Sequence, residues 1–359
     1  MKKIIYLLII MVAFSNCESI SKPNNSIDVT FASKDENIQL SGTLTMPISD
    51  SAVPVVILIH GSGGHTRNQE VLGHSTFKEL ADYLSKNGIA VLRFDKRGCG
   101  KSGGTFIPFD LDAFIADALG AVSYLKQFKG IDPDRIGVIG HSQGGLLAPK
   151  MAVADPDIAF MVLLAAPGNW DYDFFYESHK AMALAGGFPV SEVPKMEKQF
   201  IRFWGLMTKA YLSDTEREDG VELLKVLWAC LDMPSRVDFG FIDDNADLFF
   251  NHIYRTNIML DLYGSDLLST LREIACPVLA LNGDKDVQVI SSLNLPLIAS
   301  ALRNGKCENY TIKELADHNH IFQRCKTGKI SEYKHIKRSF SYTSLKIIKD
   351  WILDVNQDI

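Results

Sequence analysis

A serine stands in the pattern Gly-x-Ser-x-Gly at residues 140–144, where it follows a short apolar run and precedes a helical stretch. A serine on a tight turn between a buried strand and a helix exposes its hydroxyl beside the helix N-terminus. That position stabilises developing negative charge. We therefore predict that Ser142 is a nucleophile. A similar pattern at residues 73–77 lacks the final glycine and follows no strand, so it predicts no such role.

A serine nucleophile needs a base, and the base needs a carboxylate that orients it. When a serine stands on such a turn, the acid and then the histidine follow it in the chain. Two aspartates come after the apolar run at residues 277–281. Asp286 lies far enough beyond the run for its loop to turn back over the sheet edge, whereas Asp284 could cap its own turn. We predict Asp286 as the acid.

Two histidines, His318 and His320, follow the next apolar segment, residues 310–314. His320 is followed directly by Ile321 and Phe322, an apolar pair that would fix its loop by burial. We predict His320 as the base and His318 as a surface loop residue.

Acyl transfer also requires donors for the oxyanion. The backbone N–H of Gln143, directly after the nucleophile, is the first. The second is expected from the loop at residues 60–64, whose sequence is His-Gly-Ser-Gly-Gly. Gly61 and Gly63 would let the backbone of Ser62 face the pocket, so we predict Ser62 as the second donor and His60 as structural.

These residues need a sheet to position them. An alternating pattern at residues 27–32 and 38–46 predicts an antiparallel edge hairpin. Continuous apolar runs then alternate with helical segments, which indicates a parallel sheet with helices on both faces. The runs lie at residues 53–59, 89–94, 136–140 and 160–165, and the helical segments at 76–87, 111–128 and from 144 onward. Ligands of such sheets bind at the carboxyl ends of the strands, where the residues above fall.

The alternation stops after residue 167 and resumes at residue 277. The stretch between has helix-like segments and many aromatic residues. We predict a core in two parts, residues 27–167 and 273–359, with a helical cap of residues 168–272 inserted between them. Its aromatic side chains either line an acyl pocket or form the cap's own core.

The first 20 residues combine a basic start with an apolar run at residues 4–14, which is typical of a signal peptide. Cys17 directly follows this region and could be the lipidated first residue of a bacterial lipoprotein; we favour this over a freely secreted chain. The expected location is outside the cytoplasm, in the periplasm or on the outer surface, with a possible membrane tether through the Cys17 lipid.

The net charge is −6 and the pI is about 5.9, so no basic surface for nucleic acid is expected. Five cysteines follow Cys17 at irregular spacing, without a pattern for a metal site. A disulfide between Cys307 and Cys325 is one possibility, and buried free thiols are the other. The sequence says nothing about oligomeric state.

Taken in order, the motifs HGSGG, D-x-R-G-x-G-x-S at residues 95–102, GHSQG, GDKD and NHIF resemble the α/β-hydrolase superfamily. More narrowly, they resemble its exported bacterial esterase and serine-aminopeptidase-like branch. The resemblance implies the α/β-hydrolase fold, the triad Ser142, Asp286 and His320, and no cofactor or metal. It also implies that Asp95 and Arg97 organise the loop beneath the active site.

The expected function is hydrolysis of a small-molecule carboxylic ester through an acyl-enzyme. One alternative is a serine aminopeptidase or prolyl-type peptidase, for which Asp171, Asp173 and Glu177 are candidate ligands of a peptide amine. A second alternative, from another class, is a non-catalytic surface binding protein.

Overall fold

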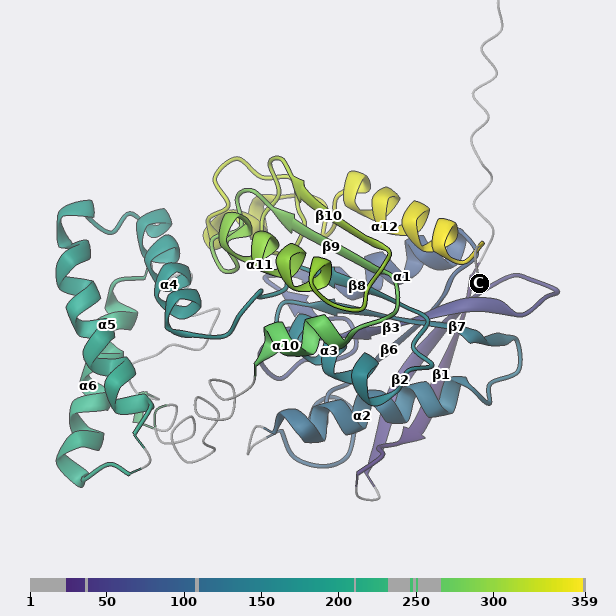
Figure 1. The fold of residues 1–359 in the computed structure, drawn as a ribbon, viewed down its shortest axis with the longest axis horizontal. Helices are drawn as coiled ribbons and strands as arrows, with labels where there is room; N and C mark the ends of the chain where they lie inside the picture. The colour runs from purple at the N-terminus through teal and green to yellow at the C-terminus, as the bar shows by residue number, and fades with distance from the viewer. Residues whose placement is uncertain are drawn as a thin grey trace, which may run out of the picture.

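The computed structural model describes residues 24–35, 38–106, 110–209, 211–231, 246–247, 250 and 266–357. The expected leader, residues 1–20 with Cys17, lies outside this part of the chain. Within it, eight strands form one sheet in the order β1-β2-β6-β3-β7-β8-β9-β10 (Figure 1). The strands are β1 (Asn24–Ala32), β2 (Gln39–Pro47), β3 (Val53–Ile59), β6 (Ala90–Phe94), β7 (Ile131–His141), β8 (Phe160–Leu164), β9 (Val278–Gly283) and β10 (Tyr310–Leu315).

Strand β2 pairs antiparallel with both β1 and β6, and every pair from β6 onward to β10 is parallel. The predicted edge hairpin and mostly parallel sheet are therefore confirmed. A separate small hairpin of β4 (Glu70–Val71) and β5 (His74–Ser75) contains the look-alike serine, Ser75. Ser75 is thus on a separate two-stranded hairpin and not on a turn that follows a strand of the main sheet.

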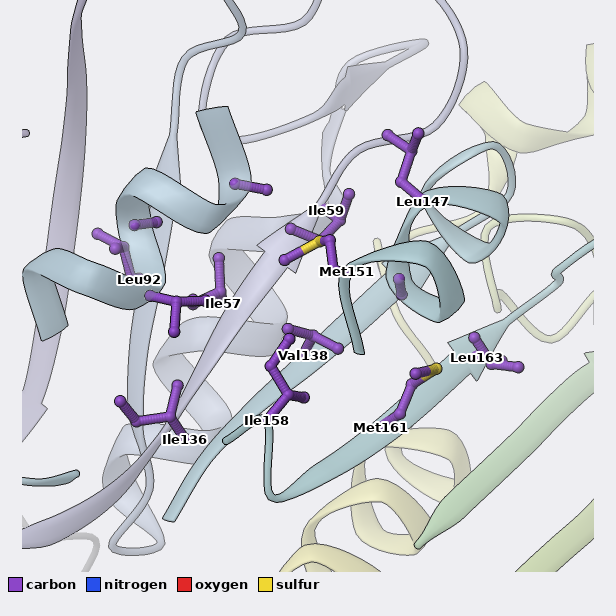
Figure 2. Packing of buried hydrophobic residues seen from close by; sticks show 14 of the residues in the cluster. Ile57, Ile59, Leu92, Ile136, Val138, Leu147, Met151, Ile158, Met161 and Leu163 are labelled. Carbon is purple, nitrogen blue, oxygen red and sulfur yellow. The ribbon is translucent and has the colours of Figure 1, made fainter. Parts of the chain in front are cut away.

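Helices cover both faces of the sheet, as predicted. Helices α1 (Thr76–Lys86) and α12 (Tyr342–Val355) pack on one face. The other face carries α2 (Leu111–Leu125), α3 (Gly144–Ala154), α10 (Leu267–Glu273) and α11 (Ser291–Arg303). Along β3, Ile57 and Ile59 point to the α2 and α3 side, and Leu58 points to the α1 and α12 side. Figure 2 shows the apolar core on the α2 and α3 side of the sheet. In it, Leu147 and Met151 of α3 belong to the same cluster as strand residues such as Ile57 and Ile59.

Helices α4 (Tyr172–Gly186), α5 (Val193–Met207) and α6 (Asp214–Ala229) form a group at the left of Figure 1, apart from the helices that cover the sheet. They share an apolar core of their own, in which Phe200, Trp204 and Trp228 are buried. These aromatic side chains therefore stabilise the inserted helices themselves. Most of helix α10 also falls within the predicted cap range 168–272, but its apolar residues belong to the core against the sheet.

The five cysteines after Cys17 are free thiols in the structure. The Sγ of Cys307 points to the carbonyl oxygens of Cys276 and Asn309, at 3.2 and 3.3 Å. Of the two possibilities left open by the sequence, a disulfide between Cys307 and Cys325 or free thiols, the structure has free thiols. Among the described helices, none is both long and apolar enough to cross a bilayer.

Candidate active site

The turn between β7 and α3 holds Ser142 in a strained conformation, with a φ of +53°. Its two flanking glycines are required by close approach. A Cβ on Gly140 would lie 2.2 Å from the carbonyl oxygen of Gly144, and one on Gly144 would lie 2.2 Å from that of Ile59. A positive φ at a non-glycine residue persists only where the surroundings enforce it, and such strain clusters at functional sites.

Asp286 and His320 are hydrogen bonded to each other. The His320 Nδ1 lies 2.8 Å from Asp286 Oδ2, and Asp286 Oδ1 accepts from the backbone N–H groups of Gln288 and Val289 at 2.8 and 2.9 Å. Both side chains are buried, that of Asp286 completely. Asp284, the alternative carboxylate, is exposed. A carboxylate held by these donors fixes the proton of His320 on Nδ1 and leaves Nε2 able to accept one.

The acid loop, residues 284–289, and the histidine loop, residues 316–325, meet because Gly283 allows it. A Cβ on Gly283 would lie only 2.0 Å from the carbonyl oxygen of His318, which accepts from the backbone N–H of Lys285 at 3.1 Å. Ile321 and Phe322 are buried, as expected of an apolar pair that fixes this loop. The Phe322 ring stacks on the ring of Phe340, which lies just before α12.

His318 is buried, with 2% of its surface exposed, so the prediction of a surface residue is wrong. Its Nδ1 donates to the carbonyl oxygen of Ala316 at 2.7 Å, and its Nε2 accepts from the hydroxyl of Ser341 at 2.7 Å. Ser341 in turn accepts from the backbone N–H of Ser344 in the first turn of α12. His318 therefore ties the histidine loop to the start of that helix, and both of its ring nitrogens are occupied.

In the described part of the chain, no hydrogen bond joins Ser142 Oγ to His320. The two residues are connected through His141, whose Nε2 donates to the carbonyl oxygen of His320 at 2.9 Å. The two imidazole rings are 4.8 Å apart. Burial, followed by the nearby His320, lowers the pKa of His141 to about 3, so His141 is neutral. The structure thus brings the predicted base to the residue next to the predicted nucleophile.

The glycine loop, residues 60–64, runs against the serine turn from the other side. A Cβ on Gly61 would lie 3.3 Å from the Cβ of Ser142. The Gly61 N–H donates to Gln69 Oε1 at 2.9 Å, and Gln69 Nε2 donates to His141 Nδ1 at 2.9 Å. The N–H groups of Ser62 and Gln143 donate to none of the described residues. Both predicted oxyanion donors therefore have unpaired N–H groups.

Sequence reasoning did not find Gln69 or the role of His141. Gln69 is 1% exposed and has a φ of +47°. Nothing in the local sequence distinguishes it from a surface glutamine, because its partners come from the glycine loop after β3 and from the end of β7. His141 lies inside the serine motif, and that position was the one available signal. Its neighbour in the glycine loop, His60, is buried against the carbonyl oxygen of Thr66, as expected of a structural residue.

The loop after β6 is held by two ion pairs. Asp95 accepts from Arg67 Nη2 at 2.8 Å, and Arg97 Nε donates to Asp117 at 2.8 Å. Asp95 also accepts from the backbone N–H of Lys101 at 2.9 Å. Asp95 and Arg97 thus fasten this loop to its neighbours, in the way the resemblance implies.

The inserted helices rest on the loops of the site. The Ser178 hydroxyl in α4 donates to the carbonyl oxygen of Gln288 at 2.6 Å, and Met182 packs against the cluster that contains Ile321. Two of the candidate amine ligands have structural partners. Asp171 accepts from the backbone N–H of Phe174 as the cap of α4, and Glu177 pairs with Lys180.

A surface cavity of about 630 Å³ lies beside the acid and histidine loops but contains none of the three predicted catalytic side chains. Its lining residues are Lys285, Asp317, Arg324, Cys325, Lys326, Glu332, His335 and Ile336. Asp317 pairs with Lys285 and Arg324, so much of its charge is compensated. Within the described residues, no cluster of side chains is suited to hold a metal ion.

Comparison with known proteins gives a consistent result. The model of the α/β hydrolase family matches residues 56–324. Over 140 residues the chain is 36% identical to esterase EstD of Thermotoga maritima, a match that covers 38% of this chain and 33% of EstD. It is 32% identical over 141 residues to the quorum-quenching protein AidA of Acinetobacter baumannii, covering 39% of this chain and 43% of AidA. The matches therefore span less than half the length of these relatives.

Among solved structures, the Pyrococcus furiosus esterase Pf2001 superposes with a TM-score of 0.56 at 17% identity, covering 93% of this chain and 91% of that one. At this identity the similarity establishes the fold. Together with the family model, which covers most of the chain, the eight-stranded sheet and the serine turn at its strand ends show that this chain belongs to the α/β hydrolase family.

Proposed function

We propose that this chain hydrolyses small-molecule carboxylic esters through an acyl-enzyme formed on Ser142. The observation that carries the proposal is the buried Asp286–His320 hydrogen bond, which His141 connects directly to the strained serine turn. The ester class is supported by the 36% identity to an esterase over 140 residues.

In the first half of the reaction, His320 Nε2 takes the proton of Ser142 Oγ as the oxygen attacks the ester carbonyl carbon. The N–H groups of Ser62 and Gln143 donate to the resulting oxyanion, and Asp286 stabilises the imidazolium. The intermediate then collapses, and His320 gives its proton to the departing alkoxide. The alcohol leaves, and the acyl group stays on Ser142.

In the second half, His320 takes a proton from water, and the hydroxide attacks the acyl-enzyme carbonyl. The same two N–H groups stabilise the second oxyanion. Its collapse releases the carboxylic acid, and the proton on His320 returns to Ser142. The burial of Asp286 and the free Nε2 of His320 suit this cycle, because one ring nitrogen stays oriented while the other exchanges a proton.

A peptidase function has less support. Of its three candidate amine ligands, Asp171 caps a helix and Glu177 is paired with a lysine. A purely binding role has less support again, because it would not require a strained serine beside an ordered acid–histidine pair. For the acyl group of the ester, Trp170 and Phe174 are two candidates among the described aromatic residues outside the cap's own core. Their rings stack at 4.9 Å, and Trp170 packs against the core beneath the sheet.

The test compares p-nitrophenyl esters of increasing acyl length with aminoacyl and prolyl p-nitroanilides. We expect ester turnover that exceeds anilide turnover and has a maximum at one acyl length. Ser142→Ala should lower kcat by about 10⁵-fold or more with the far-UV spectrum unchanged. The matched control is Ser75→Ala, which changes the look-alike serine and should keep full turnover.

A fluorophosphonate probe gives an independent readout. It should label the wild-type chain and the Ser75→Ala variant, and it should not label Ser142→Ala. Anilide turnover above ester turnover would transfer the protein to the peptidase alternative. A folded wild-type chain that neither turns over esters nor reacts with the probe would exclude the proposed function.

A further inference from the structure

Lys96 carries a buried ammonium group directly after β6. Only 5% of its surface is exposed. The charges on either side of it in the chain are paired elsewhere, Asp95 with Arg67 and Arg97 with Asp117. Within the part of the chain that the structure describes, no carboxylate forms an ion pair with Lys96. Because burial of an ammonium without a counterion is costly, its presence here indicates a specific role.

The ammonium contacts the glycine loop. Lys96 Nζ donates to the carbonyl oxygen of Gly61 at 2.5 Å and to that of Gly63 at 2.8 Å. The carbonyl oxygen between them, on Ser62, is 2.5 Å from Nε2 of His65. Burial, and then the charge of Lys96, lowers the pKa of His65 to about 4, so its ring is neutral and Nε2–H donates. All three carbonyls of this segment are therefore held by side chains.

The planarity of the peptide bond turns these contacts into an orientation. The C=O and N–H of a trans peptide point in opposite directions. The Gly61 carbonyl and the Ser62 N–H belong to one peptide unit. When Lys96 holds the carbonyl on its side, the N–H of Ser62 must point away from Lys96. This peptide begins at Gly61, where an added Cβ would lie 3.3 Å from the Cβ of Ser142. The Ser62 N–H donates to no described residue.

In the protonated form of Lys96, its positive charge adds to the orientation. An ammonium bound to a carbonyl oxygen polarises the whole peptide, which makes its N–H a stronger donor. The Phe106 and Phe114 rings lie 5.8 and 5.3 Å from Lys96 Nζ and exclude water from it. In such a low-dielectric environment the effect of the charge is larger than in water.

We propose that Lys96 is a positioning residue of the oxyanion hole, which fixes and polarises the Gly61–Ser62 peptide so that the Ser62 N–H stabilises the transition state. The proposal rests on the proposed function, in which Ser142 is the nucleophile. It assigns Lys96 no contact with the substrate.

The first experiment is Lys96→Met, which keeps the length and apolar contacts of the side chain but removes its donors and charge. Because the interaction acts on the oxyanion, kcat for the best ester should fall about 100-fold or more, and KM should change less than threefold. The matched control is Lys101→Met, an exposed lysine on the same loop, which should keep the kcat of the wild type.

A second readout separates positioning from general structural support. Phenylboronic acid forms a tetrahedral adduct with a serine nucleophile and places an oxygen in the oxyanion hole. We expect its Ki to rise in Lys96→Met in parallel with the loss of kcat. Unchanged boronate affinity, or a kcat within threefold of the wild type, would overturn the proposal and leave the proposed function intact.

If Lys96→Met does not fold, the wild-type chain itself supplies the test. The Ki of the boronate and the KM of the ester are both measured from pH 6 to pH 9.5. The ratio of Ki to KM should rise as the ammonium loses its proton. A ratio that stays constant overturns the proposal. If the wild type shows no turnover that depends on Ser142, the proposed function fails first, and the role of Lys96 falls with it.

Discussion

The two sides of Ser142 are stabilised in different ways. On one side, the acid and histidine loops carry a buried carboxylate whose oxygens accept from His320 and two backbone N–H groups. On the other side, the glycine loop is held by a buried ammonium that meets no described carboxylate. The first side is a hydrogen-bonded carboxylate and imidazole, both of them side chains. The second is backbone, oriented by a single unmatched charge.

This difference indicates which side tolerates change. The proton transfer needs both members of the hydrogen-bonded pair in place, the histidine to exchange the proton and the aspartate to orient it, so each should be individually essential for turnover. An oriented peptide keeps its N–H when the orienting group is altered, so the glycine loop should respond in a graded way. Gln69 and His141 connect the two sides by hydrogen bonds from Gly61 to His320.

The largest effect is expected at the two histidines of the histidine loop. His320→Ala should lower kcat by about 10⁵-fold, since it removes the base, while the melting temperature stays close to that of the wild type. His318→Ala should instead lower the stability of the fold and leave kcat unchanged. Two buried hydrogen bonds are lost, so the free energy of unfolding should fall by about 1–3 kcal/mol, and the folded fraction should retain its kcat. Urea denaturation and initial rates measure both. An inactive but stable His318→Ala would contradict the assignment.

The two aspartates of the acid loop should differ almost as much. Asp286→Asn keeps the shape of the side chain but no longer holds the proton of His320 on Nδ1, so kcat should fall by about 10⁴-fold. Asp284→Asn changes an exposed side chain and should leave kcat within about twofold, since surface substitutions have small effects. Equal losses in both variants would mean that the acid has been assigned wrongly.

A smaller effect is expected at the bridge between the two sides. Gln69→Leu leaves the Gly61 N–H and the Nδ1 of His141 without partners. We expect kcat to fall by about 10- to 100-fold, because both the glycine loop and the histidine loop lose a support, and stability to fall by about 1–3 kcal/mol. Gln127→Leu, at an exposed glutamine, is the control. A variant with wild-type kcat would show that the two sides act independently.

The smallest effect concerns pH. Burial lowers the pKa of Lys96 to about 7, with nearby Cys99 acting in the opposite direction. The other groups that face the ammonium are His60 and His65 from the glycine-loop side and two aromatic rings. The neutral amine keeps N–H donors but loses its charge, so kcat should decline by about fivefold between pH 7 and pH 9. The decline should be absent in Lys96→Met.

Stability should move the other way over the same range. The pKa of Lys96 is about 7 in the folded chain and has its ordinary value of 10.5 in the unfolded chain. Between these values the unfolded chain binds more protons, so the contribution of Lys96 to the free energy of unfolding rises with pH. Urea denaturation of the wild type and Lys96→Met at pH 6.5 and pH 9.5 measures this difference. A contribution that falls with pH would contradict the burial of a charged Lys96.

The sequence alone predicted the sheet, its helices and the serine turn, because these depend on local patterns. Apolar runs specify buried strands, and the glycines at residues 140 and 144 specify a turn that a Cβ would block. The structure brings Asp286 and His320 into contact and leaves Asp284 exposed, which is the arrangement that the proposed roles of Asp286 and His320 require. The prediction that His318 is a surface residue was wrong, since a buried histidine that bonds a helix cap has the same local sequence as a surface one.

The sequence by itself therefore determined which residues stand at the strand ends and which chemistry we propose for them. The tertiary structure alone decided how they are held. Gln69 meets His141 across 72 positions of the chain, and His141 meets His320 across 179. Lys96 reaches the carbonyl of Gly61 across 35. Such contacts depend on the packing of strands that are distant in the sequence. No local pattern records them, because each side chain would be equally compatible with a surface position.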